Sequence, residues 1–98
     1  MKMHQYPYVN RRKKTIQFWI HNSIADHITL SGNFNQGTSG ELQMMPGKDG
    51  DWFVEIPMLP EGKYHYRFFI DDCMWMEDVG NRLREPDGVH GWYSVLNV

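Results

Sequence analysis

The sequence predicts an all-β protein, an antiparallel β-sandwich of the immunoglobulin-like type, and three observations lead to this fold class. Apolar and polar residues alternate along several short stretches, as in strands that bury one face, and no useful length of chain has helical periodicity. Turn-forming residues interrupt these stretches at short intervals. The chain has 98 residues, the length of one domain, and many short strands in about 100 residues are typical of such a sandwich.

Each expected strand has apolar residues at alternate positions or, where it is very short, is an apolar run between turn residues. The first has Ile16, Phe18 and Ile20 on one face, and the second offers Ile28 and Leu30. The third is a short apolar piece that a Pro-Gly pair closes. In chain order, the expected strands lie at residues 15–22, 26–31, 42–45, 51–58, 63–71, 74–76 and 92–98.

The fourth and fifth expected strands are predicted to supply much of the core. Their alternate positions hold large apolar or aromatic side chains, which point to one face of a strand. We expect these two strands to pair through neighbouring hairpins. The predicted core residues on them are Trp52, Val54, Ile56, Tyr66, Phe68 and Ile70.

Turn residues separate the strands. An Asp-Gly pair precedes the fourth strand, and glycine supplies the positive φ that a tight hairpin requires. A Pro-Glu-Gly sequence before the fifth strand predicts another turn. Asp71 and Asp72 are a weaker turn signal, because aspartate enters the left-handed region less easily than glycine. Residues 32–41 and 77–91 are rich in polar residues and glycine, so both are expected to be surface loops.

Charge and composition exclude several classes of partner. The net charge of -2 gives no general attraction to nucleic acid or to acidic membranes. The basic run at residues 11–14 could contact phosphates, but no second basic cluster accompanies it, and we interpret it as a solvated segment. Residues 1–14 are therefore expected to be an N-terminal lead-in, and residues 15–98 the β-sandwich domain.

The single cysteine, Cys73, excludes an internal disulfide bond. No stretch is long and apolar enough to span a bilayer, and the N-terminal residues contain no apolar signal core. These observations predict a soluble protein in a reducing compartment, the cytoplasm.

Short motifs follow one another in an order that is typical of one known family. They occupy residues 28–35 (ITLSGNFN), Met45 with 49–52 (DGDW), 59–71 (LPEGKYHYRFFID), then Trp75, Asp78 and Asn81, and finally Asp87-Gly88 with 94–98 (SVLNV). Their order and spacing resemble carbohydrate-binding module family 48. That family includes the glycogen-binding domain of the AMP-activated protein kinase β subunit and the N-terminal domains of isoamylases and glycogen branching enzymes. The resemblance covers residues 15–98 and implies an early-set sandwich that binds α-1,4-linked glucans without catalysis.

The resemblance also implies a sugar-binding surface. In the family, a tryptophan that stacks on a glucose ring follows the F-N-x motif. Here Gly37 stands at that position, and glycine offers no stacking platform. The family's binding lysine corresponds to Arg67, which should face outward and either donate paired hydrogen bonds to hydroxyls or form a cross-strand ion pair. A second family tryptophan corresponds to Trp75, if one residue is inserted before it; the alternative is that Trp75 belongs to a satellite core.

Further aromatic residues lie near the end of the chain. The family's sugar-contacting asparagine is Tyr93 here, preceded by Trp92. Alternation allows at most one of the two to point inward, so the other could replace the missing stacking surface, or one could cap the open end of the sandwich. Leu83 lies in the loop where the family lodges a small apolar residue in a turn of the glucan. We expect Trp75 and one of Trp92 or Tyr93 to form a stacking surface, with Arg67 along its rim.

The sequence gives no sign of catalysis, a metal site or a cofactor. Its 5 histidines are scattered and lack ligand spacing. Asp71 and Asp72 are adjacent and would point to opposite faces of a strand, whereas a glycosidase needs two carboxylates that converge on one bond.

Three functions remain open. The favoured one is a non-catalytic α-glucan-binding module that partners a glucan-active enzyme. The second is a protein–protein interaction module of the same fold that has lost sugar binding, as Gly37 suggests. The third and least favoured is an enzyme. Convergence of Arg67, Trp75, Trp92 and Tyr93 on one exposed face would favour sugar binding; burial or scatter would favour the second function.

Overall fold

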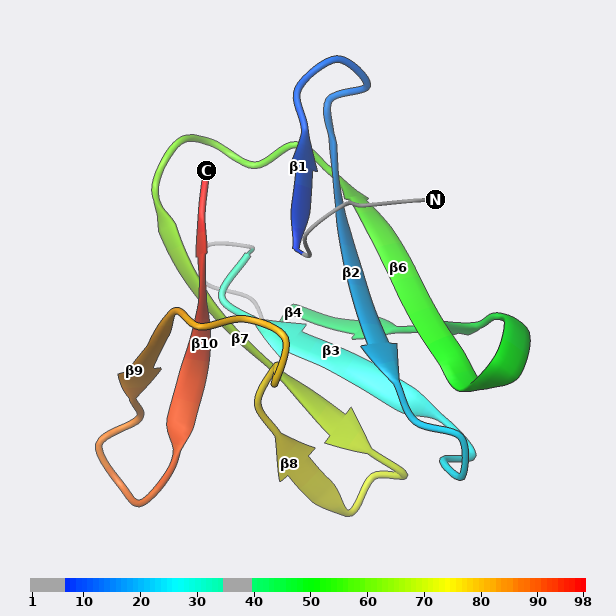
Figure 1. Cartoon of the computed structure of the whole chain (residues 1–98). Coiled ribbons are helices and arrows are strands. Elements are labelled where there is room, and N and C mark those ends of the chain that lie inside the picture. The colour runs from blue at the N-terminus through cyan, green and yellow to red at the C-terminus, as the bar shows by residue number, and fades with distance from the viewer. Residues whose placement is uncertain (1–6, 35–39) are drawn as a thin grey trace.

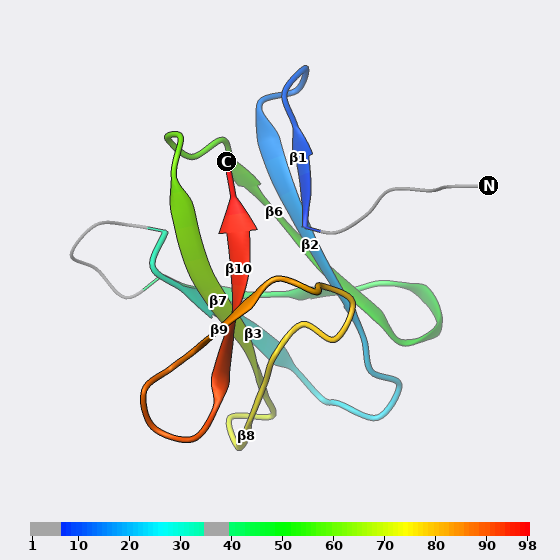
Figure 2. The same ribbon diagram turned by 60° about the vertical axis from the view of Figure 1, so that its left-hand side comes forward.

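The computed structural model describes residues 7–34 and 40–98 as two antiparallel sheets that form a sandwich (Figures 1 and 2). The four-stranded sheet has the order β1 (Tyr8–Asn10), β2 (Thr15–His21), β6 (Asp51–Pro57), β5 (Met45–Pro46). The six-stranded sheet has the order β4 (Gly40–Gln43), β3 (Ile28–Gly32), β7 (Lys63–Ile70), β10 (Trp92–Asn97), β9 (Arg84–Pro86), and β8 (Met74–Met76) also pairs with β7. A short 3-10 helix, η1 (Lys48–Gly50), joins β5 to β6. The predicted fold class is confirmed.

The core lies between the sheets and is formed by the alternate positions that the sequence indicates. Phe18 of β2 meets Tyr66 of β7 edge to face, with ring centroids 5.0 Å apart. Of the predicted core residues, all but Val54 are buried, and Val54 packs against the core while partly exposed. The buried hydrophobic residues in the described part of the chain are Ile16, Phe18, Ile28, Leu30, Phe34, Met44, Trp52, Ile56, Tyr66, Phe68, Ile70, Val95 and Leu96.

The expected pairing of the two main core strands is wrong. β6 pairs with β2 and β5 in one sheet, whereas β7 pairs with β3, β10 and β8 in the other. The predicted Pro-Glu-Gly turn between them is therefore a crossover between sheets. The backbone groups of Gly62 in this crossover pair with those of Val98, at 3.0 and 2.9 Å. Both strands turn their buried faces to the same core, which explains why both show the same alternation.

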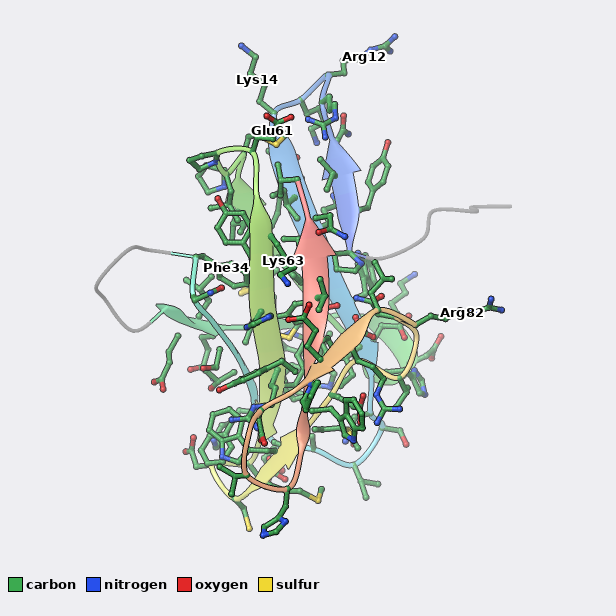
Figure 3. The ribbon with its side chains drawn as sticks, turned by 90° about the vertical axis from the view of Figure 1, so that its left-hand side faces the viewer. Arg12, Lys14, Phe34, Glu61, Lys63 and Arg82 are labelled. Carbon is green, nitrogen blue, oxygen red and sulfur yellow. The ribbon has the colours of Figure 1, made fainter. Side chains whose placement is uncertain are left out.

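Two strands lie where the sequence predicts none. β1 falls within the expected lead-in and pairs with β2, with Val9 opposite Ile16. β9 falls within the second expected surface loop and pairs with β10. The basic run forms the turn between β1 and β2, where Arg12 and Lys14 project away from the body of the molecule (Figure 3). The sheet thus begins before residue 15, and the basic run is exposed as expected.

The Asp-Asp pair after β7 is a true turn, despite its weak signal. Asp71 and Asp72 both have positive φ, 53° and 54°, as a tight hairpin requires at its two central residues. Asp71 Oδ1 accepts the backbone N–H of Asp26 at 2.7 Å and that of His27 at 2.9 Å. These donors lower the pKa of Asp71, and they fix the β7–β8 hairpin against the segment that leads into β3.

A buried polar network anchors the segment between β8 and β9. The hydroxyl of Tyr66 donates to Asp78 Oδ2 at 2.6 Å, and the Asp78 N–H donates to Ser94 Oγ at 2.8 Å. The Asn81 amide donates to Tyr66 Oη and to the Val95 carbonyl, each at 2.9 Å. Burial raises the pKa of Asp78. Asp78 and Asn81, which the family motif contains, therefore tie the segment between β8 and β9 to β7 and β10.

In the part of the chain that the structure describes, no helix has the length and apolar character needed to cross a membrane.

Candidate functional site: an aromatic row with a clamped arginine

The candidate site lies at the middle of β7, where the strand that pairs with one of its edges changes from β10 to β8. From Lys63 to Tyr66, this edge pairs with β10, and from Phe68 to Ile70 it pairs with β8. Arg67 is the residue between the two ladders, and its side chain points to the outer face of the sheet. A residue from β10 and a residue from β8 can therefore approach Arg67 from either side. Figure 3 looks onto this sheet, with β7 and β10 in front.

The guanidinium of Arg67 is held between two aromatic rings and a carboxylate. Its Cζ lies 4.7 Å from the ring centroid of Trp75 on β8 and 4.5 Å from that of Tyr93 on β10. Both distances are those of cation–π contacts. Its Nη1 donates to Asp87 Oδ2 at 3.0 Å, and only 21% of the arginine side chain and 11% of the aspartate side chain are exposed. Arg67 thus faces outward, as expected, and it forms an ion pair, although its partner Asp87 lies in the β9–β10 loop rather than on a neighbouring strand.

Two further rings extend this group in both directions. Trp75 stacks on Phe69, with centroids 4.4 Å apart and planes at 28°. Tyr93 stacks on His65, with centroids 5.1 Å apart and planes at 3°. The side chains of Phe69, Trp75, Arg67, Tyr93 and His65 form what we call the aromatic row. Trp75 keeps 46% of its surface exposed, so it is not a satellite core residue.

A shallow groove adjoins the row. It has a volume of about 330 Å³ and is lined by Ser31, Gly32, Asn33, His65, Arg67 and Tyr93. The Asn33 side-chain oxygen accepts the His65 N–H at 2.8 Å, which fixes the loop after β3 beside β7. Glycine is required at position 32 because a Cβ there would lie 2.5 Å from the Phe34 ring and 2.9 Å from the His65 carbonyl. The Gly-Asn-Phe motif thus shapes one wall of the groove.

Asp87 is a site residue that sequence reasoning missed. Its Oδ1 accepts the backbone N–H groups of Val89, His90 and Gly91, at 2.8, 3.2 and 3.0 Å, while its Oδ2 receives Arg67. The donors at Val89 and Gly91, followed by those at His90 and Arg67, lower the pKa of Asp87. One carboxylate therefore shapes the β9–β10 loop and orients the arginine. The only sequence signal is the Asp-Gly pair, which is a common turn sequence.

Glu85 on β9 continues the polar side of the site. It accepts hydrogen bonds from Lys63 and from the ring of His65, the latter at 2.7 Å. Lys63 first, and then His65, lower the pKa of Glu85. His65, which sequence reasoning also passed over, is thereby held between a carboxylate and the Tyr93 ring.

Two of the expected site residues do not join the row. Trp92 is next to Tyr93 in β10 and so points to the other face of the sheet, where the Arg84 guanidinium lies 3.9 Å from its ring centroid. Leu83 is exposed just before β9 and borders a different hollow, with Pro7 and Val9. The structure therefore brings together Arg67, Trp75 and Tyr93 only. Gly37, where the family tryptophan is missing, lies outside the described residues.

Metal chemistry finds no support in the described ranges, 7–34 and 40–98, which contain no cluster of three or more His, Cys, Asp or Glu residues that could hold an ion.

Residues 15–93 match the family described as the glycogen recognition site of AMP-activated protein kinase. The chain belongs to this family, whose members are carbohydrate-binding modules. The resemblance of the sequence motifs is thus confirmed. No curated protein matches the sequence.

Solved structures of much longer proteins contain the same fold. A proposed alpha amylase from Salmonella typhimurium superposes with a TM-score of 0.70 at 20% identity, over 93% of this chain and 14% of that protein. A pullulanase from Bacillus acidopullulyticus gives 0.68 at 14% identity, over 88% and 11%. A pullulanase from Anoxybacillus sp., solved with maltotetraose, gives 0.67 at 16% identity, over 87% and 12%. At these identities the likeness shows the fold, and this chain spans only a small part of each protein.

Proposed function

We propose that this protein is a non-catalytic module that binds α-1,4-linked glucans, such as glycogen or maltooligosaccharides, on the outer face of its six-stranded sheet. The observation that carries the proposal is the convergence of Arg67, Trp75 and Tyr93 on one exposed face. Membership of a glycogen-recognition family supports the class of ligand. Three of the four residues named for this test converge, whereas Trp92 points to the other face of β10 beside Arg84, so the test supports sugar binding through three residues only.

The chemistry of the row suits a pyranose ring. The apolar C–H face of the sugar packs on an aromatic surface, and Trp75 offers one that is nearly half exposed. Arginine carries five N–H donors, and Asp87 engages Nη1, so further donors remain for sugar hydroxyls. Because two rings and a carboxylate already hold the guanidinium, binding a sugar orders little that is not ordered beforehand.

The affinity for a short oligosaccharide should be weak. Each stacked ring contributes about 1–2 kcal/mol once competition with water is included, and the Gly37 position adds no stacking. A binding free energy of about -4 kcal/mol corresponds to a dissociation constant of about 1 mM. A branched polymer, which presents many chain ends, is therefore the more sensitive probe.

Affinity electrophoresis in gels that contain glycogen tests the proposal. The natural protein should migrate more slowly than in gels without glycogen, and Trp75→Ala should be retarded much less while melting at a similar temperature. Met45→Ala is the matched control, because Met45 is an exposed apolar residue on the other sheet. Equal retardation of the natural protein and Trp75→Ala would reject this site, and retardation of neither would reject glucan binding.

We also propose that the module works beside a glucan-active enzyme. The solved proteins that share its fold include pullulanases, in which the fold is a small part of the chain. The surface that favours a protein contact is the outer face of the four-stranded sheet, where Trp19 and Phe53 stack with centroids 5.3 Å apart beside the exposed Met45. Co-sedimentation with a pullulanase, compared between the natural protein and Met45→Glu, tests this: the variant should co-sediment less. No co-sedimentation of the natural protein would count against this partner.

A further inference from the structure

A second group of the same composition lies on the other side of the β9–β10 loop. The Arg84 guanidinium stacks over the Trp92 ring at 3.9 Å. Glu77 holds that guanidinium through Nε at 3.1 Å and Nη2 at 3.3 Å. This group has the same three components as the group at Arg67: an exposed aromatic ring, an arginine stacked on it, and a carboxylate that fixes the arginine.

Trp92 is not explained as a core residue. It shares one face of β10 with Ser94 and Leu96, which are both buried, yet 40% of Trp92 is exposed. Arg84 covers it only partly, and Arg84 and its partner Glu77 are themselves partly exposed. Exposed tryptophan surface is costly in water, and it is typical of sites that bind something.

A hollow adjoins this ring. It has a volume of about 230 Å³ and is lined by Pro86, Gly88, Val89, His90, Gly91 and Trp92. Its wall is thus the β9–β10 loop, which Asp87 shapes from the other side. The loop therefore separates two surfaces, the aromatic row and the Trp92 hollow, and each has an aromatic ring with a clamped arginine beside it.

We propose that Trp92, with Arg84, forms a second α-glucan contact that is separate from the aromatic row. This inference rests on the proposed function, because it assigns the same class of ligand to a second surface. A glucosyl unit would pack its C–H face on the exposed part of the indole, and the remaining N–H groups of Arg84 would donate to its hydroxyls. The module then holds two segments of one branched polymer, one on each side of the loop.

Two weak contacts on one polymer strengthen each other. Once the first segment is bound, the second binds from a high effective concentration, so the polymer gains affinity that a short oligosaccharide does not. Loss of Trp92 should therefore weaken binding to glycogen about tenfold or more. It should leave the affinity of the aromatic row for maltotetraose unchanged within about twofold, because distant independent sites contribute additively.

Nuclear magnetic resonance of the indole N–H groups separates the two surfaces. The 4 tryptophans give separate signals, which single Trp→Phe variants assign. Trp52 is an internal reference, because it is buried and its Nε1 donates to the Asn22 carbonyl at 3.0 Å. On titration with maltotetraose, the signals of Trp75 and Trp92 should move while that of Trp52 stays. In Trp75→Ala, the Trp92 signal should still move, with a dissociation constant within about twofold of the original.

The outcomes distinguish this inference from the function on which it rests. Movement of the Trp75 signal alone would overturn the second contact and leave the proposed function standing. Movement of neither signal would overturn both. Loss of the Trp92 shift in Trp75→Ala would show one continuous site and would also overturn the inference. These titrations do not require Trp92→Ala to fold. A second variant, Arg84→Gln, keeps the Trp92 ring and should also weaken retention in glycogen gels.

Discussion

Asp87 and Arg67 show how single residues prepare the site before a ligand arrives. The carboxylate uses one oxygen for three backbone N–H groups of the loop and the other for the guanidinium. The two roles are carried by different atoms, and so they can be separated by mutation.

Asp87→Asn should keep the loop and release the arginine. The side-chain oxygen of asparagine can still accept the backbone N–H groups, whereas its amide cannot accept from Arg67. We expect the loop amide chemical shifts to change little and retention on glycogen to fall severalfold. Asp87→Ala, which removes both functions, is the comparison. Collapse of the loop signals in Asp87→Asn would contradict this division of roles.

The same pair predicts a pH dependence. Backbone donors and Arg67 lower the pKa of Asp87 below its ordinary value of 3.8, so the folded state favours the carboxylate. The ionised Asp87 carboxylate therefore contributes its full stabilisation above about pH 4–5. That stabilisation is lost as the pH falls through the lower pKa of Asp87 in the folded state. Urea unfolding at several pH values should show a gap between the natural protein and Asp87→Asn that narrows only in this acid range. A gap that stays constant down to pH 2 would contradict it.

Phe68 tests the register of β7. It is fully buried and meets Tyr66 at 5.9 Å, whereas its neighbour Phe69 stacks on Trp75 on the outer face. Phe68→Ala should lower the free energy of unfolding by about 3–5 kcal/mol, a large share of what a small domain has. Phe69→Ala should cost about 1 kcal/mol. A larger loss for Phe69→Ala than for Phe68→Ala in urea unfolding would show that the register is off by one residue.

At the scale of residues, the sequence predicts the parts of the site that strand alternation controls. The outward direction of Arg67 follows from the buried Tyr66 and Phe68 on either side of it. Alternation could not choose between Trp92 and Tyr93, because that choice depends on the register of β10, in which Ser94 faces Tyr66. Asp87 is brought to Arg67 by a loop, and a loop has no periodicity that a sequence could reveal.

At the scale of elements, β1 shows that the domain uses residues before its expected boundary at residue 15. Val9 packs against the core, and β1 covers the edge of β2 with three residue pairs, from Tyr8 opposite Gln17 to Asn10 opposite Thr15. β1 and β9 are each three residues long, too short for alternation to be recognised. Both exist because a longer neighbouring strand offers free backbone groups.

A chain that begins at Thr15 should therefore be less stable than one that begins at Pro7. It loses the packing of the partly buried Val9, worth less than the roughly 1.5–3 kcal/mol of a fully buried side chain, and it uncovers the edge of β2, which invites association between copies. Urea unfolding and analytical ultracentrifugation measure the two effects. Equal stability and a monomeric state for both chains would place the boundary at residue 15 after all.

At the scale of the whole molecule, the two carboxylates beside the row lack the raised pKa of a glycosidase's general acid. A glycosidase needs one carboxyl group with a raised pKa as its general acid, but Asp87 and Glu85 both have lowered pKa values. Asp78, whose pKa is raised, is buried in the network with Tyr66. We expect the purified protein to release no reducing sugar from amylose or glycogen and to form no new branches. Activity that survives stringent purification would overturn this expectation.

Binding to glucan should depend little on salt. The ligand is neutral, so its binding releases no counterions, in contrast to binding of a phosphate polymer. The ion pair of Arg67 with Asp87 is largely shielded from water, and salt screens such a pair weakly. Retention in glycogen gels should change less than about twofold between 0.05 and 0.5 M salt. A steep decrease would instead point to an anionic ligand.

The arrangement of the sheets has a consequence for the time that the chain needs to fold. Thr15 faces Pro57 in one sheet and Ile28 faces Ile70 in the other, so each sheet depends on a pairing between segments about 40 residues apart. Closing such loops costs entropy before the core repays it. Folding should therefore take milliseconds to seconds, as in other sandwiches of this kind. The local hairpins β1–β2 and β7–β8 can form early, but the surface that carries Arg67 exists only after β7 has met β3 and β10.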